Sequence, residues 1–182
     1  MPMMPGKTAL LELFKQEGVK IVFGNPGTTE LPLMDAFAAE QELRYVLALQ
    51  EAPAMGMADG YAQASGQLSV VNLHAAPGLG NAMGMLYDAQ QAGSPVLVTA
   101  GQHEQRFSFT EPLLWADLPV IARPFVKWSE EVRRLEDLPR AIPGIRRRGG
   151  VHVARSLGAV QRRDPRRRST VRDSTPHTPG SS

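Results

Sequence analysis

Residues 44–66 read RYVLALQEAPAMGMADGYAQASG, a segment that contains a strand, a carboxylate and a helix in immediate succession. Residues 44–49 form a short apolar run of the kind found in buried parallel strands. Pro53 fits the first turn of the helix that follows, and Gly66 ends that helix about three turns later. Glu51 is therefore predicted at the carboxyl end of a strand and the amino end of a helix, where open α/β sheets bind their ligands.

The flanking segments continue the alternation of strands and helices. Apolar runs predict further strands at residues 19–24, 68–73 and 95–100. Apolar periodicity predicts helices at residues 8–17 and around Met34 and Phe37. A further helix is predicted to follow a glycine loop at 75–80 and to reach Gly93. Short links between such elements indicate a parallel, helix-covered sheet with right-handed crossovers, which is an α/β fold of three layers.

The pattern weakens after residue 101. We expect a short helix at 111–117, a short strand at 124–128, and a helix that starts near residue 136 and is broken by Pro143 after about one turn. Beyond residue 146 arginine, serine, threonine, proline and glycine dominate, apart from an apolar patch at 151–157. We therefore expect disorder in this last part of the chain.

Polar residues follow each of the four clear strands. The Asn25–Thr29 turn, Glu51, His74 and the Gln102-His103 pair are expected to converge on one rim of the sheet. Each has an ordinary structural explanation when it is taken alone. A helix dipole favours a glutamate such as Glu51 by about 0.3–1 kcal/mol, threonines cap helices, and histidines are often satisfied structurally. It is their convergence that makes the rim the candidate site.

The glycine-rich segment 78–84 does not predict a dinucleotide site. It reads GxGxxxG, whereas the dinucleotide fingerprint requires GxGxxG. The strand that follows, at 95–100, also lacks the acidic residue that would bind a ribose.

Composition sets the broad class of protein. The 182 residues suffice for one α/β domain of ordinary size, and the absence of cysteine excludes disulfides and thiolate metal sites. The amino-terminal apolar residues are interrupted before they reach the length of a signal peptide, and no run approaches that of a membrane span. These features predict a soluble cytoplasmic protein that does not act at a membrane.

The net charge of +2 conceals two regions of opposite sign. Residues 146–182 contain ten of the 20 lysines and arginines but only two of the 18 acidic residues, so they carry +8. Residues 1–145 then carry −6. The two regions follow different compositional rules, which indicates a boundary between them.

Four ordered segments closely resemble the amino-terminal, pyrimidine-binding domain of thiamine-diphosphate-dependent enzymes. They are FGNPGTTELPLMDA (23–36), YVLALQEAPAMGMADGYAQASG (45–66), VNLHAAPGLGNAMGMLYDA (71–89) and PVLVTAGQ (95–102), and RPFVKWSEEV (123–132) is also typical. Within that superfamily the chain is most similar to benzoylformate decarboxylase and its relatives. The resemblance runs from residue 6 to 142, so we predict that domain at 6–142 and a separate tail at 143–182.

The resemblance implies roles for three catalytic residues. Glu51 would bond to N1′ of the aminopyrimidine of thiamine diphosphate and help the cofactor to lose its C2 proton. His74 matches a histidine that relays protons to substrate-derived intermediates. Thr28 stands where benzoylformate decarboxylase has a serine that meets the carboxylate of a 2-keto acid, and its extra methyl group leaves specificity for aryl substrates open. Cofactor contacts are implied at Glu51, Asn25, Pro26, Gly27, Gly78 and Asn81.

Other features of the family are not found in the sequence. Gln102-His103-Glu104 replaces the tandem histidines of pyruvate decarboxylase. In the family a second domain, usually from another subunit, binds the diphosphate and its Mg²⁺ through a Gly-Asp-Gly…Asn-Asn signature, which does not occur here. We therefore predict no metal ligand in this chain, Mg²⁺ binding only through the missing domain, and either a homo-oligomer or a partner subunit that supplies it.

Three interpretations of the basic tail follow. In relatives the helix interrupted here at Pro143 continues and is followed by a last apolar strand. We expect this strand to be missing here. Apolar surface would then be exposed, and the chain would aggregate or stay partly molten. Arginine, proline, glycine and serine are typical of a GC-rich gene translated out of frame, which is our first hypothesis. Alternatively, the chain is the pyrimidine-binding subunit of a split enzyme. A nucleic-acid-binding tail is the third interpretation, disfavoured because the tail has no aromatic residue for stacking on bases.

Overall fold

Six strands form a single parallel sheet in the protein, of which a computed structural model describes residues 4–142 and 150–155. The strand order is β2-β1-β3-β4-β6-β5, and every neighbouring pair is parallel. The strands are β1 (Ile21–Gly24), β2 (Arg44–Leu47), β3 (Ser69–Leu73), β4 (Val96–Ala100), β5 (Trp128–Glu131) and β6 (Val151–Arg155).

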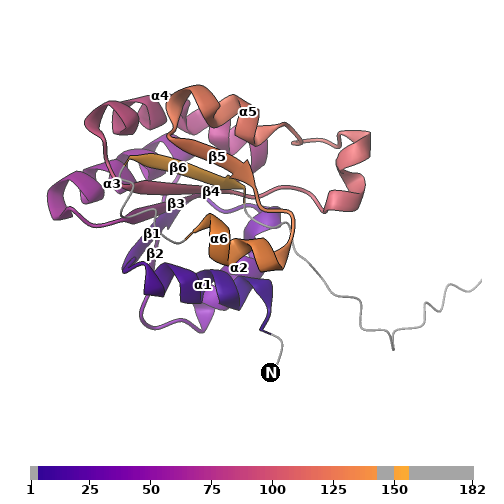
Figure 1. Ribbon diagram of the computed structural model, residues 1–182, viewed down its shortest axis with the longest axis horizontal. Coiled ribbons are helices and arrows are strands. Elements are labelled where there is room, and N and C mark those ends of the chain that lie inside the picture. Colours follow the sequence, from indigo (N-terminus) through magenta and orange to yellow (C-terminus); the bar gives the residue numbers. More distant parts are fainter. Residues whose placement is uncertain (1–3, 143–149, 156–182) are drawn as a thin grey trace, which may run out of the picture.

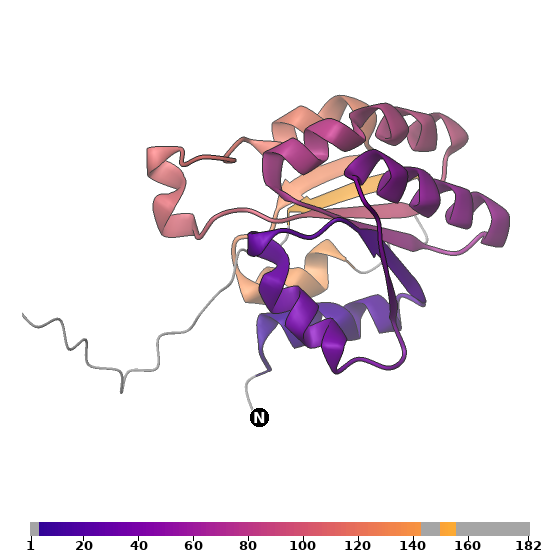
Figure 2. The same ribbon diagram turned by 180° about the vertical axis from the view of Figure 1, so that it is seen from behind.

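Helices cover both faces of this sheet (Figures 1 and 2). One face carries α3 (Glu51–Ser65), α4 (Ala75–Ala92) and α5 (Leu118–Ala122), and the other carries α1 (Gly6–Gln16), α2 (Leu31–Ala38) and α6 (Leu138–Ala141). Short 3₁₀ helices lie at η1 (Thr28–Glu30), η2 (Gln105–Thr110), η3 (Arg123–Phe125) and η4 (Leu135–Asp137). The predicted three-layer α/β fold is confirmed.

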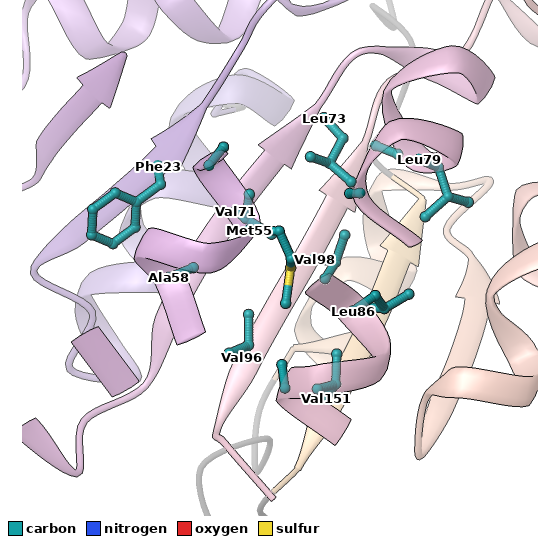
Figure 3. Packing of buried hydrophobic residues seen from close by; sticks show 14 of the residues in the cluster. Phe23, Met55, Ala58, Val71, Leu73, Leu79, Leu86, Val96, Val98 and Val151 are labelled. Atoms are coloured by element: carbon teal, nitrogen blue, oxygen red, sulfur yellow. The ribbon is translucent and has the colours of Figure 1, made fainter. Parts of the chain in front are cut away.

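Alternating side chains along the central strands divide the core into two clusters. Phe23, Val71 and Val98 face α3 and α4, as Figure 3 shows, whereas Val22 and Val70 belong to the cluster beneath α1 and α2. This alternation with a period of two is the pattern that a strand buried on both faces requires. It leaves the carboxyl ends of the strands as the edge from which polar side chains can project.

Strand β2 differs from its prediction. We predicted a buried strand, but β2 lies at the edge of the sheet, where β1 is its one partner among the described strands. Leu47 is 66% exposed and Leu49, just beyond the strand, is 96% exposed. An apolar run does not by itself tell a central strand from an edge strand, because the number of neighbours depends on the fold.

The glycine segment after β3 also differs from its prediction. Helix α4 begins at Ala75, directly after β3, so residues 75–80 are its first turns rather than a loop. None of the glycines within α4 has a positive φ, so glycine is not required there by backbone conformation. Gly66 and Gly93, by contrast, end α3 and α4 in the left-handed conformation, as predicted.

The region from 101 to 142 is only partly as predicted. Residues 111–117 form no helix. Instead, α5 starts at Leu118, where the Asp117 side chain caps the backbone N–H of Val120 at 3.4 Å. The strand predicted at 124–128 begins only at Trp128, because η3 extends to Phe125 and the next two residues belong to no helix or strand. The short helix near residue 136 is confirmed as η4 and α6.

The expectation that the last strand is missing is wrong. Residues 151–155 form β6, which lies between β4 and β5 and pairs with both. Val151 and His152 are each 1% exposed. The apolar patch is short, but it pairs with a strand on each side, which stabilises it as a strand. The apolar surface that we expected to be exposed is therefore covered by β6. The expected disorder and the out-of-frame origin concern residues that lie largely outside those the structure describes.

Burial of Val151 provides a test of β6. Val151→Asp places a charge in the core, so we expect a loss of more than about 3 kcal/mol from a total stability of about 5–15. Val120→Asp makes the same change at a 55% exposed position and should leave the stability nearly unchanged. Urea unfolding followed by circular dichroism measures both, and equal midpoints would show that residues 151–155 do not form part of the core.

Candidate functional site

Glu51 lies at the rim where the sheet meets the amino ends of α3 and α4. It is the first residue of α3, and Gln50 caps that helix by accepting a hydrogen bond from Ala52 N at 3.3 Å. The residue as a whole is only 6% exposed. The predicted position, between the carboxyl end of a strand and the amino end of a helix, is confirmed.

Two side-chain amides bind the Glu51 carboxylate. Asn25 Nδ2 donates to Oε1 at 3.3 Å, and Asn81 Nδ2 donates to Oε2 at 3.0 Å. Gly78 packs so closely that a Cβ there would lie 3.1 Å from Oε1. Four of the residues that we predicted for cofactor binding are therefore gathered in one place, although their roles stay predictions.

A second buried carboxylate, Glu30, lies beside His74. Glu30 is 3% exposed and accepts three hydrogen bonds: from Gly27 N at 2.8 Å, from Thr29 Oγ1 at 2.5 Å and from His74 Nδ1 at 2.8 Å. Because Oε2 of Glu30 also accepts from Gly27 N, we assign Nδ1 of His74 as the donor in this contact. Nε2 is thus left as the nitrogen that can accept a proton or, once protonated, donate one.

Two glycines make room for this network. A Cβ at Gly27 would lie 2.3 Å from the His74 ring, and a Cβ at Gly101 would lie 1.7 Å from Glu30 Oε1. Any larger residue at either position would displace the histidine or the carboxylate. The glycines after β1 and β4 are therefore required by close approach.

Sequence reasoning missed Glu30. The only signal was its place three residues after Gly27, where a glutamate reads as the second half of a capping box, and the structure shows that contact. A capping glutamate is normally on the surface, and its burial against His74 and Gly101 depends on residues that are distant in sequence.

The structure does not place the other predicted residues in these contacts. Thr28 is exposed, and its neighbour Thr29 carries the hydroxyl that reaches His74 Nδ1 at 3.2 Å. Pro26 is half-buried within the turn. Gln102 Nε2 donates to Ala116 O at 3.1 Å, which ties it to the segment before α5.

Beneath the rim, a chain of polar groups crosses the sheet. Burial raises the pKa of Tyr45, and the nearby charge of Glu30 raises it further, so the hydroxyl stays neutral and donates to Asn72 Oδ1 at 3.4 Å. Asn72 Nδ2 donates in turn to Thr99 Oγ1 at 3.1 Å, and Asn72 O accepts from Asn25 N at 3.3 Å. This chain anchors the turn that presents Asn25 to Glu51.

The rim therefore presents the hydrogen-bond-accepting carboxylates of Glu30 and Glu51 and the side chain of His74. In residues 4–142 and 150–155, no three His, Cys, Asp or Glu side chains gather so that they could hold a metal ion. Within the same described ranges, no helix combines the length and the apolar character needed to cross a membrane.

Comparison with known proteins places the sequence and the fold in one group. Residues 4–113 match the family described as thiamine pyrophosphate enzyme, N-terminal TPP binding domain. The chain is 43% identical over 136 residues to benzoylformate decarboxylase of Pseudomonas aeruginosa, which covers 74% of this chain and 25% of that protein. It is 34% identical over 137 residues to the acetolactate synthase large subunit of Lactococcus lactis, covering 75% and 24% respectively.

A solved structure agrees with these matches. Benzoylformate decarboxylase from Polynucleobacter necessarius superposes with a TM-score of 0.78 at 36% identity, over 84% of this chain and 30% of that one. The chain spans about a quarter of the length of the curated relatives that it matches.

The hydrogen bond from His74 to Glu30 predicts a tautomer. In the parent chain the neutral His74 ring should carry its proton on Nδ1, and Glu30→Ala should move it toward Nε2. The ¹⁵N chemical shifts of the ring report both states. His103 is the internal control, because its Nε2 donates to Leu113 O at 2.6 Å and should keep its proton in both proteins. A parent His74 protonated on Nε2 would contradict the assignment.

Proposed function

Because the chain belongs to the thiamine pyrophosphate enzymes, whose N-terminal TPP binding domain it carries, we propose that it binds the aminopyrimidine half of thiamine diphosphate for a 2-keto acid decarboxylase. The observation that carries this proposal is the Glu51 carboxylate, buried at the rim between two amide donors. The finer assignment, to a non-oxidative decarboxylase of benzoylformate decarboxylase type, rests on the similarity to that enzyme.

The residues at the rim fit such a ring. Each carboxylate oxygen of Glu51 can accept about two hydrogen bonds, and one amide fills one of these places on each oxygen. A ring N–H can therefore still bind to Glu51. When bound, thiamine diphosphate supplies the electron sink that a 2-keto acid needs in order to lose carbon dioxide.

The proposed roles of the chain's own residues follow from their hydrogen bonds. Glu51 accepts the ring N–H and exchanges a proton with it, which is general acid–base assistance. His74, held by Glu30 through Nδ1, presents Nε2 to hold or move a proton near the substrate. For Thr28, which is exposed, we propose from the similarity to benzoylformate decarboxylase alone that its hydroxyl meets the substrate carboxylate.

Part of the proposed site lies elsewhere. We propose that the diphosphate and its Mg²⁺ are bound by a different domain, supplied by a second copy in a homo-oligomer or by a separately encoded partner subunit. We place this assembly in the cytoplasm. A carboligase of acetolactate synthase type is the second candidate, supported by the 34% identity to that enzyme over the same region.

The proposal predicts that the chain alone has little affinity for thiamine diphosphate. A few hydrogen bonds to the pyrimidine at about 0.5–1.5 kcal/mol each and one apolar ring face, set against an association cost of at least about 4 kcal/mol, leave little net affinity, in the millimolar range or weaker. We also expect no decarboxylase or carboligase activity. Titration calorimetry and assays of carbon dioxide and acetolactate from benzoylformate and pyruvate test both statements, and magnesium-dependent micromolar binding would contradict them.

In the assembled enzyme, Glu51→Gln tests the proposed proton exchange. Glutamine keeps the shape and one hydrogen bond but cannot exchange a proton, so deuterium exchange at C2 of the bound cofactor should slow by about 10²–10⁴-fold. Glu130→Gln, at an exposed position on β5, is the matched control and should leave the rate unchanged. An unchanged rate in Glu51→Gln would remove Glu51 from this role.

A further inference from the structure

We propose that Asn81 and Asn25 are positioning residues, which hold the two oxygens of Glu51 so that the carboxylate faces an incoming ring N–H. This inference rests on the proposed function, and it changes the role expected for both asparagines from contact with the cofactor to control of the glutamate. Each amide binds a different oxygen, at 3.3 Å from Asn25 and at 3.0 Å from Asn81. The carboxylate is thereby fixed at both ends.

The first turn of α3 explains why side-chain amides are needed. A glutamate at the start of a helix normally turns back to bind the free backbone N–H groups of that turn. Here Ala52 N already donates to Gln50 Oε1, and Pro53 has no N–H. Ala54 N donates to Gln50 O at 3.2 Å. Of the three residues that follow Glu51 in this turn, two have backbone N–H groups that are already taken and the third has none.

The carboxylate is left to donors from two other elements. Asn25 comes from the turn after β1, and Asn81 comes from the second turn of α4. Gly78 lies three residues before Asn81, so both occupy the same face of α4. A Cβ at Gly78 would lie 3.1 Å from Oε1 and 3.3 Å from Cγ of Glu51. Gly78 therefore lets α4 pack against the Glu51 side chain with no side chain of its own between them.

If Asn81 and Asn25 position Glu51, a change in one asparagine should alter the hydrogen bond between Glu51 and the other. If Asn81 loses its amide, Oε2 is freed and the carboxylate can rotate, which also weakens its bond to Asn25. A hydrogen bond to a charged group corresponds to a change of about 10- to 100-fold in binding. Asn81→Ala should therefore abolish the weak binding of thiamine that we expect of the parent chain at millimolar concentrations.

The first experiment needs no ligand. Nuclear magnetic resonance of the full chain follows the side-chain amide protons of Asn25, and both Asn81→Ala and Glu51→Ala should shift them and speed their exchange with water. Gln91→Ala makes the same amide-to-alanine change at an exposed position on α4 and should have no effect. Asn25 signals that do not respond to Glu51→Ala would overturn the proposal.

The second experiment separates positioning from general structural support. Amide shifts induced by millimolar thiamine should be lost in Asn81→Asp at pH 7, because the new carboxylate repels Glu51, and should return near about pH 5, when the introduced carboxyl donates a hydrogen bond. Asn81→Ala should show no such return. A loss in Asn81→Asp that persists at low pH, or a return in Asn81→Ala as well, would overturn the proposal.

The two experiments also distinguish this inference from the proposed function. If the Asn25 signals respond as expected but thiamine shifts no amide of the parent chain, the positioning of Glu51 stands and the proposed cofactor is wrong. If thiamine binds and the Asn25 signals do not respond, the proposed function stands and the positioning role is wrong.

A pair of glycine variants provides a third measurement. Gly80→Ala adds a methyl group with nothing within 4 Å, whereas Gly78→Ala adds one against the carboxylate. Both replace a helical glycine, so both gain helix propensity. Only Gly78→Ala should shift the Asn25 amide, and an equal response of the two variants would count against the fixed carboxylate.

Discussion

Two carboxylates, Glu30 and Glu51, are almost wholly removed from water at one rim of the sheet. Burying a charge is unfavourable unless hydrogen-bond donors replace the lost water. Three donors surround Glu30 and two bind Glu51. The composition of the rim follows from this requirement. Asparagine, threonine and histidine supply donors, while Gly27, Gly78 and Gly101 let them approach closely enough to bind.

The turn after β1 connects the two carboxylates. Asn25 donates to Glu51, and Gly27 donates to Glu30 only two residues later. The turn is held from below, because Asn72 in the neighbouring strand accepts from Asn25 N. Among the hydrogen bonds that the structure shows, none joins the side chains of Tyr45, Asn72 or Thr99 to Glu30 or Glu51. A change in these three side chains would still reach both carboxylates, because it would move the turn.

Local signals predicted the first four strands, their helices and the position of Glu51. Gly66 ends α3 through its own backbone conformation, so it could be recognised without knowledge of the fold. The features that the sequence did not reveal depend on distant neighbours. Leu47 is exposed on a strand that lies at the edge of the described sheet, and Glu30 is buried because it meets His74 and Gly101. Residues 151–155 form a strand because β4 and β5 flank them.

The place of β6 in the sheet constrains the order in which the chain can fold. Strand β5 pairs only with β6 among the described strands, although it precedes β6 in the sequence. During synthesis β5 must therefore wait without a neighbour until β6 has been made, and pairings between distant segments form slowly. The four strands that carry the rim, β1 to β4, need no such delay, so the part of the molecule that holds Glu30 and Glu51 can assemble while the far edge of the sheet is still open.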